Sequence, residues 1–329
     1  MGNTIAILGA GNAGTTFALI AAQNANAVRL WTVEEDVAET MRQKRENRKY
    51  LPGVTLPEEI VVEGDLQKAV TGTDVVMLTV PSHVVRRLAR AIAPFLTPEQ
   101  ILLDVAKGIE EKTYYLMSEV IHSELSGAVR QNIVALSGPS IAREMSHGVP
   151  TAVAVAGFTR RHAEQVRQAF ESTTFHVEVL DDMVGIQLGG ALKNIYALAA
   201  GMCDGLAYGN NTKSALVTRA LVEMTQFGQA LGAQTETFYG LAGVGDLVVT
   251  CFGPQSRNRT FGEKLARGQT RGQILAESVE VAEGVQVTKV AHALAQTLRL
   301  RLPLLDMVYK ILYDDLPPRQ ALSVFLRGL

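Results

Sequence analysis

The sequence predicts an α/β domain with a doubly wound sheet over residues 1–182 and an all-α domain over residues 183–329. Three observations lead to this prediction. The chain has 329 residues, more than a single hydrophobic core usually serves. Short apolar runs alternate with helical stretches up to about residue 180. From about Met183 onward only long helical patterns occur.

Seven strands are predicted in the first domain, and several are nearly continuous apolar runs, which is typical of buried parallel strands. Because helical stretches separate them, we expect right-handed crossovers between parallel strands. Ligands bind such sheets at the carboxyl ends of the strands. The strands are predicted at Ile5–Leu8, Val28–Trp31, Val75–Val80, Ile101–Val105, Ile133–Leu136, Ala152–Val155 and Val177–Leu180.

Long helical patterns fill the second domain, and glycine and alanine crowd the first of them. A glycine inside a helix costs roughly 1 kcal/mol relative to alanine, so several glycines indicate close backbone packing. We therefore expect this helix to be central. The helices are predicted at Val184–Leu206, Lys213–Leu231, Phe261–Arg267, Gly284–Leu298 and Leu304–Tyr313.

A glycine-rich motif, Gly9-x-Gly11-x-x-Gly14, lies between the first strand and a helical run. The first glycine allows a tight turn, the second lets the backbone approach a pyrophosphate, and the third lets the helix press on the strand. The helix N-terminus offers N–H groups and a positive dipole end to the anion. Glu34 and Glu35 follow the second strand, where a carboxylate can hold ribose hydroxyls. The first domain is therefore predicted to be a Rossmann-type domain that binds a dinucleotide.

Composition narrows the class of protein. The net charge of −2 argues against nucleic acid or an anionic membrane surface as the main partner. Cys203, Cys251 and the six histidines show no metal-ligand or disulfide spacing, so neither kind of site is expected. No apolar run reaches the roughly 18 residues of a membrane span, and the first strand begins without the pattern of a signal peptide. We expect a cytoplasmic protein with reduced thiols.

Lys193 is the first candidate catalytic residue. It lies beside Asn194 in an apolar helical run, with no acidic residue three or four positions away. It is either a lysine that reaches solvent from an apolar face or, in a cleft, a proton-transfer group whose pKa falls from about 10.4. Lys107 follows the strand Ile101–Val105 and is either an exposed loop lysine or a like charge that helps hold Lys193 neutral.

Two further groups of residues in the second domain carry candidate chemistry. Asp246 follows a glycine-rich turn and either caps a helix or takes part in catalysis, and the sequence leaves both open. The run Ser256–Arg259 is either a basic helix start or a set of donors for a phosphate dianion, and we favour phosphate binding. The chain contains neither a GxSxG nor a GxxxxGK[ST] motif, so hydrolase and kinase functions lose their main support.

At these residues the chain resembles the NAD(P)-dependent glycerol-3-phosphate dehydrogenases over essentially its full length. Many spaced matches in the same order are more specific than any one motif. The matching motifs are Gly9–Thr15, Glu46–Gly53, Lys107–Glu110, Ser137–Ser140, Ala191–Asn194, Gly209–Lys213, Gly245–Leu247, Thr250–Cys251 and Ser256–Arg259.

The resemblance implies reversible hydride transfer between NAD(P)H and dihydroxyacetone phosphate, which yields sn-glycerol 3-phosphate for phospholipid synthesis. It implies that Lys193 donates and accepts the proton at the C2 oxygen, and that Asp246 organises it with the substrate contact Lys107. This agrees with the chemistry, because an ammonium quenches the charge that develops on a ketone oxygen as hydride arrives. Apolar helix faces in the second domain would suit a homodimer.

The resemblance also implies the binding residues, with Arg257 and Asn258 at phosphate-binding positions. The predicted coenzyme-binding residues are Gly9, Gly11, Asn12, Ala13, Gly14, Glu34, Lys107, Ala142, Arg257 and Glu283. The predicted substrate-binding residues are Lys107, Gly138, Ser140, Lys193, Asn194, Asp246, Thr250, Ser256, Arg257 and Asn258.

Two positions depart from the family's pattern. Ala13 stands where the family usually has an aromatic residue. Glu34, Glu35 and Asp36 follow the second strand, where bacterial members often carry arginine for a 2′-phosphate. Acidic residues repel that phosphate and favour a ribose hydroxyl, so we predict NAD as the preferred coenzyme, with NADP possible but less favoured.

Two other functions are compatible with parts of the sequence. A reductase with the same two-domain plan could act on another hydroxy or keto acid, but that substrate would leave Ser256–Arg259 without a role. A nicotinamide-binding sensor without catalysis is the second, and the presence of Lys193, Lys107 and Asp246 together argues against it.

Overall fold

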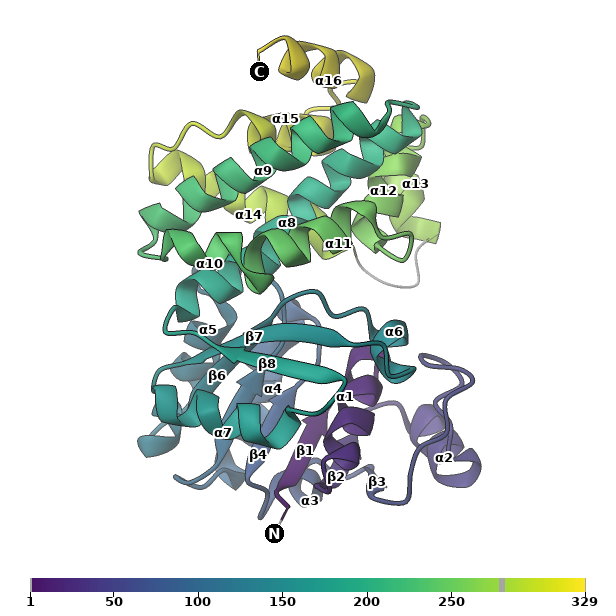
Figure 1. The fold of residues 1–329 in the computed structure, drawn as a ribbon, viewed down its shortest axis with the longest axis vertical. Helices are drawn as coiled ribbons and strands as arrows, with labels where there is room; N and C mark the ends of the chain where they lie inside the picture. The colour runs from purple at the N-terminus through teal and green to yellow at the C-terminus, as the bar shows by residue number, and fades with distance from the viewer. Residues whose placement is uncertain (1, 278–281, 329) are drawn as a thin grey trace. The chain divides into compact units, whose positions relative to one another are not determined.

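A computed structural model describes residues 2–277 and 282–328. They form two compact units (Figure 1). The first unit comprises the chain up to Ala106 together with Tyr115–Met183, and the second comprises Lys107–Tyr114 and Val184–Leu329. A single boundary after residue 182 does not describe this division, because the segment Lys107–Tyr114 belongs with the helical unit.

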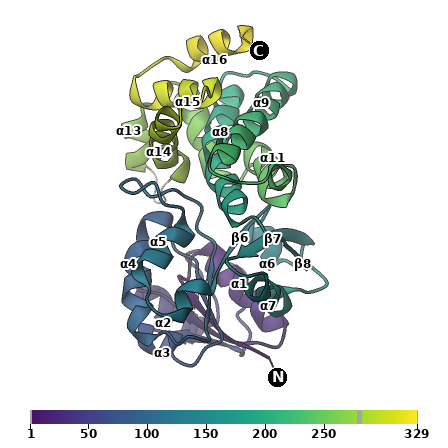
Figure 2. The same ribbon diagram turned by 90° about the vertical axis from the view of Figure 1, so that its left-hand side faces the viewer.

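The first unit is built on an eight-stranded sheet with the order β3-β2-β1-β4-β5-β6-β7-β8. Figure 2 labels the three strands at one end of this order, β6, β7 and β8. Neighbouring strands are parallel except for β6 and β7, which are antiparallel. The strands are β1 (Thr4–Leu8), β2 (Ala27–Trp31), β3 (Ile60–Glu63), β4 (Val75–Leu78), β5 (Ile101–Asp104), β6 (Ile133–Ser137), β7 (Thr151–Gly157) and β8 (Phe175–Val179).

The predicted α/β class is confirmed, with two corrections. The prediction that β6 and β7 are parallel is wrong. The short helix α6 (Ala142–Ser146) and the turn after it reverse the chain, so β7 runs antiparallel beside β6. Strand β3 was not predicted. It is a four-residue strand at the edge of the sheet, and its apolar run, Ile60–Val62, is short and has Val61 half exposed.

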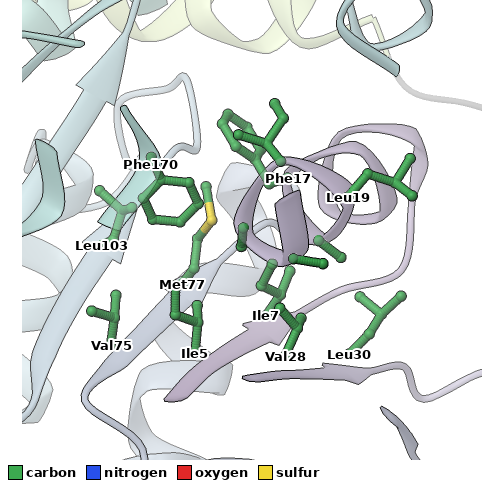
Figure 3. Close-up of a cluster of buried hydrophobic side chains, with 14 of the residues drawn as sticks. Ile5, Ile7, Phe17, Leu19, Val28, Leu30, Val75, Met77, Leu103 and Phe170 are labelled. Atoms are coloured by element: carbon green, nitrogen blue, oxygen red, sulfur yellow. The ribbon is translucent and has the colours of Figure 1, made fainter. Parts of the chain in front are cut away.

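Helices cover both faces of the sheet. One face packs Ile5, Ile7 and Met77 against Phe17 of α1 and Phe170 of α7 (Figure 3). The other face packs against α3, α4 and α5. The helices and 3₁₀ turns of this unit are α1 (Asn12–Gln23), α2 (Glu35–Lys44), α3 (Leu66–Val70), α4 (Ser82–Ile92), η1 (Ala93–Phe95), α5 (Met117–Glu124), η2 (Ala128–Gln131), α6 and α7 (Arg160–Phe170).

Within residues 184–277 and 282–328 the chain forms helices and turns without a strand. The predicted long helices are present as α8, α9, α12, α14 and α15, each with ends shifted by a few residues. The elements are α8 (Met183–Gly205), α9 (Asn210–Ala230), α10 (Thr235–Tyr239), the π-helical turn η3 (Leu241–Gly245), α11 (Asp246–Phe252), α12 (Arg257–Ala266), α13 (Arg271–Glu277), α14 (Glu283–Thr297), α15 (Pro303–Tyr313) and α16 (Pro318–Arg327).

Helix α8 is the centre of the second unit, and all its residues from Gly185 to Cys203 are buried. Its glycines allow other backbones to come close, as the sequence predicts. A Cβ at Gly189 would lie 2.2 Å from the carbonyl oxygen of Ala242, and one at Gly201 would lie 1.8 Å from that of Arg259. The glycines therefore bring η3 and α12 against the helix that carries Lys193. No helix among the described residues is long and apolar enough to cross a membrane.

Candidate functional site

The turn after β1 has the geometry that its glycines predict. Gly9 has a φ of +120°, and a Cβ there would lie 2.9 Å from the carbonyl oxygen of Thr79. A Cβ at Gly14 would lie 1.8 Å from the carbonyl oxygen of Gly9. Larger residues would therefore push α1 away from the strand.

The N-terminus of α1 can accept the pyrophosphate of a dinucleotide. Gly11 is the N-cap of the helix, and among the described residues no atom beyond its own neighbours in the chain lies within 4 Å of a Cβ built there. Asn12 and Ala13 of the first turn are accessible, and the Asn12 carboxamide oxygen accepts a hydrogen bond of 2.7 Å from the Ala13 amide. The first turn of α1 carries no acidic residue, so its dipole and N–H groups favour an anion.

Two residues that fix this turn were not predicted. The Thr79 hydroxyl, just after β4, donates to the carbonyl oxygen of Gly9 at 2.8 Å. The Asn47 carboxamide donates to the carbonyl oxygen of Ala10 at 2.8 Å. Thr79 lies inside the predicted strand Val75–Val80, and because the observed strand ends at Leu78, its position at the strand end was not predicted. Asn47 lies far from the turn in sequence and gives no signal of its contact there.

Glu34 precedes α2 and lies half exposed, close to where β2 ends. Its carboxylate accepts a hydrogen bond from the Tyr50 hydroxyl at 2.7 Å and another from the Lys49 ammonium. Glu35 pairs with Arg42 at 2.8 Å. The carboxylate that the sequence assigns to the ribose hydroxyls is therefore held in place from two sides.

The loop after β6 contains three more predicted residues. Gly138 has a φ of +138°, and its carbonyl oxygen accepts a bond of 3.0 Å from the Ser140 hydroxyl. The Ala142 carbonyl oxygen accepts a bond of 3.2 Å from Thr16 of α1, which places this loop beside the glycine turn. Among the described residues the buried Ser137 hydroxyl has no hydrogen-bond partner, so this strand end keeps an unused polar group.

In the second unit, three predicted catalytic residues meet. The Lys107 ammonium donates to one carboxylate oxygen of Asp246 at 2.7 Å, and the Lys193 ammonium donates to the other. Asp246 is fully buried and Lys193 is 7% exposed, whereas the Lys107 side chain is 20% exposed. Two ammonium groups on one carboxylate leave an excess of positive charge, which favours an anionic ligand.

Burial lowers the pKa of Lys193 to about 7. The carboxylate of Asp246 opposes this effect, and the charge of Lys107 adds to it. The sequence alternative of a solvent-reaching lysine is therefore wrong for Lys193. An amine with a pKa near 7 is present in both protonation states at neutral pH and can act as acid or base.

The capping alternative for Asp246 is wrong as well. Gly245 occupies the N-cap position of α11, and Asp246 is the first helical residue. Its side chain binds the two lysines instead of backbone N–H groups. Thr250, one turn later, donates from its hydroxyl to the Asp246 carbonyl oxygen at 2.6 Å and fixes the start of the helix.

Asn194 and Asn258 form a second buried pair. The Asn258 carboxamide donates to the side-chain oxygen of Asn194 at 2.9 Å and accepts a bond of 3.0 Å from the Gly284 amide. A Cβ at Gly284 would lie 2.5 Å from the Asn194 carbonyl oxygen. The start of α14, where Glu283 lies half buried, is thus held against α8 and α12.

The Ser256–Arg259 run divides into structural and accessible parts. The Ser256 hydroxyl oxygen caps α12 by accepting from the Arg259 amide at 3.3 Å. The Arg259 guanidinium binds Asp204 at 2.7 Å and Glu263 at 3.1 Å, so the hypothesis of two phosphate-binding guanidiniums is wrong for Arg259. Arg257 lies exposed in the first turn of the helix, where an anion is favoured.

The cysteines take no part in these clusters. Cys203 and Cys251 are buried thiols outside any disulfide, and burial raises the pKa of each to about 12. Such thiols are poor nucleophiles and poor metal ligands. Among residues 2–277 and 282–328, no group of three His, Cys, Asp or Glu side chains is placed to hold a metal ion.

Comparison with known proteins places the chain in a family. The family model for the NAD-dependent glycerol-3-phosphate dehydrogenase N-terminus matches residues 4–163, and that for the C-terminus matches residues 182–323. A protein of Geobacter sp. (strain M21) named glycerol-3-phosphate dehydrogenase (NAD(P)+) is 44% identical over 330 residues, which cover 100% of this chain and 98% of that protein.

Two solved structures are similar over nearly their whole length. Glycerol-3-phosphate dehydrogenase from Coxiella burnetii has 36% identity and a TM-score of 0.93, with 99% of each chain covered. The enzyme of that name from Saccharomyces cerevisiae has 30% identity and a TM-score of 0.85, with 98% of each chain covered. The chain therefore belongs to the NAD-dependent glycerol-3-phosphate dehydrogenase family.

Proposed function

We propose that this chain catalyses reversible hydride transfer between NAD(P)H and dihydroxyacetone phosphate, with sn-glycerol 3-phosphate as the reduced product. Family membership and the names of the similar proteins support this reaction. The observation that carries it is the buried Asp246 carboxylate shared by Lys193 and Lys107. In this proposal the strand ends of the first unit bind the coenzyme and the helical unit binds the substrate.

Lys193 is the proposed proton donor and acceptor. The nicotinamide supplies or receives the hydride when the coenzyme is bound. During reduction, the Lys193 ammonium donates its proton to the C2 oxygen, where negative charge develops. During oxidation the neutral amine takes the proton from the C2 hydroxyl. Asp246 orients the lysine, and Lys107 adds a positive charge toward the substrate.

Arg257 is the proposed contact for the substrate phosphate, supported by its exposed position in the first turn of α12. Asn194 and Asn258 shape the adjoining buried surface. Of the other predicted substrate residues, Gly138 and Ser140 lie in the loop after β6, Thr250 lies in α11 and Ser256 caps α12. A phosphate contact away from the reacting carbon orients the ketone and distinguishes this substrate from unphosphorylated hydroxy or keto acids.

NAD(H) is the proposed preferred coenzyme, because the residue after β2 that we propose to bind the ribose hydroxyls is the carboxylate Glu34. The same carboxylate is paired with Lys49, so NADP(H) is disfavoured and not excluded. Supply of glycerol 3-phosphate for phospholipid synthesis in the cytoplasm is the proposed role.

Replacing Lys193 by alanine should abolish catalysis and leave coenzyme binding intact. We expect turnover of dihydroxyacetone phosphate with NADH to fall by about 10²–10⁴, because the general acid is lost. Turnover is followed by the loss of reduced-nicotinamide absorbance. Lys310→Met removes an exposed lysine of α15 and should match the unaltered protein. Undiminished turnover in Lys193→Ala would refute the proposed role.

The reaction should depend on pH in opposite ways for its two directions. Reduction needs the Lys193 ammonium, so its rate should fall as pH rises through about 7, whereas oxidation needs the neutral amine and should gain rate there. Lys107→Met removes a charge that lowers the Lys193 pKa. The pH profiles of reduction and of oxidation should therefore both move to higher pH, by about one unit. Profiles that stay in place would show that Lys107 does not tune Lys193.

Arg257→Ala should raise the KM for dihydroxyacetone phosphate by about 10- to 100-fold, because a charged phosphate contact is removed. The KM for NADH serves as the internal reference and should change less. Arg257→Lys keeps the charge without the planar fork and should give an intermediate KM. Unchanged kinetics would favour a reductase that acts on an unphosphorylated hydroxy or keto acid.

A homodimer is part of the proposal, supported by exposed apolar side chains on α9, α10 and α11, namely Val222, Tyr239, Val248 and Phe252. Light scattering of the purified protein should give twice the chain mass of 35.5 kDa. A mass equal to one chain at micromolar concentration would reject the dimer.

A further inference from the structure

The segment Glu46–Tyr50 belongs to the motif Glu46–Gly53 that resembles the family's pattern. In the proposal above only Lys49 of this segment has a role, as the partner of Glu34. The segment lies between α2 and the turn that contains Gly53, and it contacts two of the proposed coenzyme-binding elements through side chains. One contact reaches the glycine turn after β1, and the other reaches Glu34 after β2. Neither connection is visible in the order of residues along the chain.

Asn47 forms the first contact. Its side chain is 1% exposed, and its carboxamide nitrogen donates to the Ala10 carbonyl oxygen at 2.8 Å and to the Thr15 hydroxyl at 2.7 Å. Its carboxamide oxygen accepts from the Tyr50 amide at 3.2 Å. One buried side chain therefore joins the glycine turn, the first turns of α1 and the backbone of the segment itself.

Lys49 and Tyr50 form the second contact. The Tyr50 hydroxyl donates to one carboxylate oxygen of Glu34 at 2.7 Å, and the Lys49 ammonium donates to the other. Each carboxylate oxygen has a second lone pair, so Glu34 can still accept from a ribose hydroxyl. The two donors fix the carboxylate in one orientation.

The two contacts act at neighbouring positions of the sheet. Strands β1 and β2 pair in parallel with Leu8 opposite Trp31, and the Gly9 amide donates to the Trp31 carbonyl oxygen at 2.9 Å. The glycine turn and the chain leading to Glu34 therefore leave the same edge of the sheet side by side. The segment Glu46–Tyr50 fixes both in relation to each other.

The two donors to Glu34 differ in charge. Tyr50 orients the carboxylate and leaves its negative charge in place. Lys49 orients it and also offsets that charge, as Arg42 does for the neighbouring Glu35. The repulsion of a 2′-phosphate by this acidic run therefore depends on Lys49, because a paired carboxylate repels a phosphate less than an unpaired one.

We propose that Lys49 and Tyr50 are positioning residues for coenzyme choice, tied to the glycine turn by Asn47. Tyr50 strengthens the preference for NAD(H) by presenting Glu34 to the ribose hydroxyls. Lys49 moderates the same preference by lowering the charge that a 2′-phosphate meets. This inference rests on the proposed function, because it takes the coenzyme to bind at the edge formed by β1 and β2.

The test is a pair of binding titrations, with NADH and with NADPH, on the full chain. Trp31, the single tryptophan, ends β2 and gives a fluorescence signal close to Glu34. The quantity measured is the ratio of the Kd for NADPH to the Kd for NADH. We expect Tyr50→Phe to lower this ratio and Lys49→Met to raise it, each by about three- to tenfold.

Opposite signs are the decisive feature, because a general loss of structure would weaken both coenzymes alike. Lys44→Met removes the same charge from an exposed position at the end of α2 and should leave the ratio unchanged. Asn47→Ala should weaken both coenzymes by a similar factor without changing the ratio. Lys49 and Tyr50 donate from exposed or half-buried side chains, so their variants are expected to fold even if Asn47→Ala does not.

Ratios that stay constant, or that move in the same direction in Tyr50→Phe and Lys49→Met, would overturn the inference. That outcome differs from failure of the proposed function, in which the unaltered protein would bind neither coenzyme or would not reduce dihydroxyacetone phosphate. Binding by the unaltered protein with unchanged ratios in the variants would keep the function and reject only the roles of Lys49 and Tyr50.

Discussion

The candidate catalytic site depends on one buried carboxylate. Asp246 is fully buried, and an isolated buried carboxylate would be strongly destabilising. Two ammonium groups compensate it, one from α8 and one from the segment Lys107–Tyr114. This requirement explains why a short segment embedded in the sequence of the first unit belongs to the second. It also leaves the cluster with surplus positive charge, which is what an anionic substrate needs.

The cluster of Asp246, Lys193 and Lys107 also explains why α8 is rich in apolar residues and glycine. A lysine with a pKa near 7 has to be removed from water, and the apolar surface of α8 achieves this. The glycines let η3 and α12 approach the helix closely enough to exclude solvent. Substituting them would affect more than helix stability, because the depth at which Lys193 is buried sets its proton affinity.

The sequence predicted the parts of the fold that have strong periodicity. All seven predicted strands pair in parallel with at least one neighbour, and the long helices lie where the patterns place them. Strand β3 and the reversal at β7 were missed, because a short edge strand and a five-residue helix leave weak patterns. Contacts between residues that lie far apart in the sequence could not be predicted either. Nothing near Arg259 in sequence indicates that Asp204 binds it, or that Asn47 holds the Ala10 carbonyl.

The residues that follow β1 and β2 show why a count of charged residues in the sequence is insufficient to predict coenzyme preference. Three acidic residues after β2 indicate repulsion of a 2′-phosphate, yet two of them carry a cation as partner in the structure. The field at the ribose position depends on these pairs and not on the acidic run alone. Lys49 lies 15 positions beyond Glu34. In the proposed coenzyme site, selection between two coenzymes that differ by one phosphate thus depends on a contact between distant residues as much as on the residue assigned to the ribose.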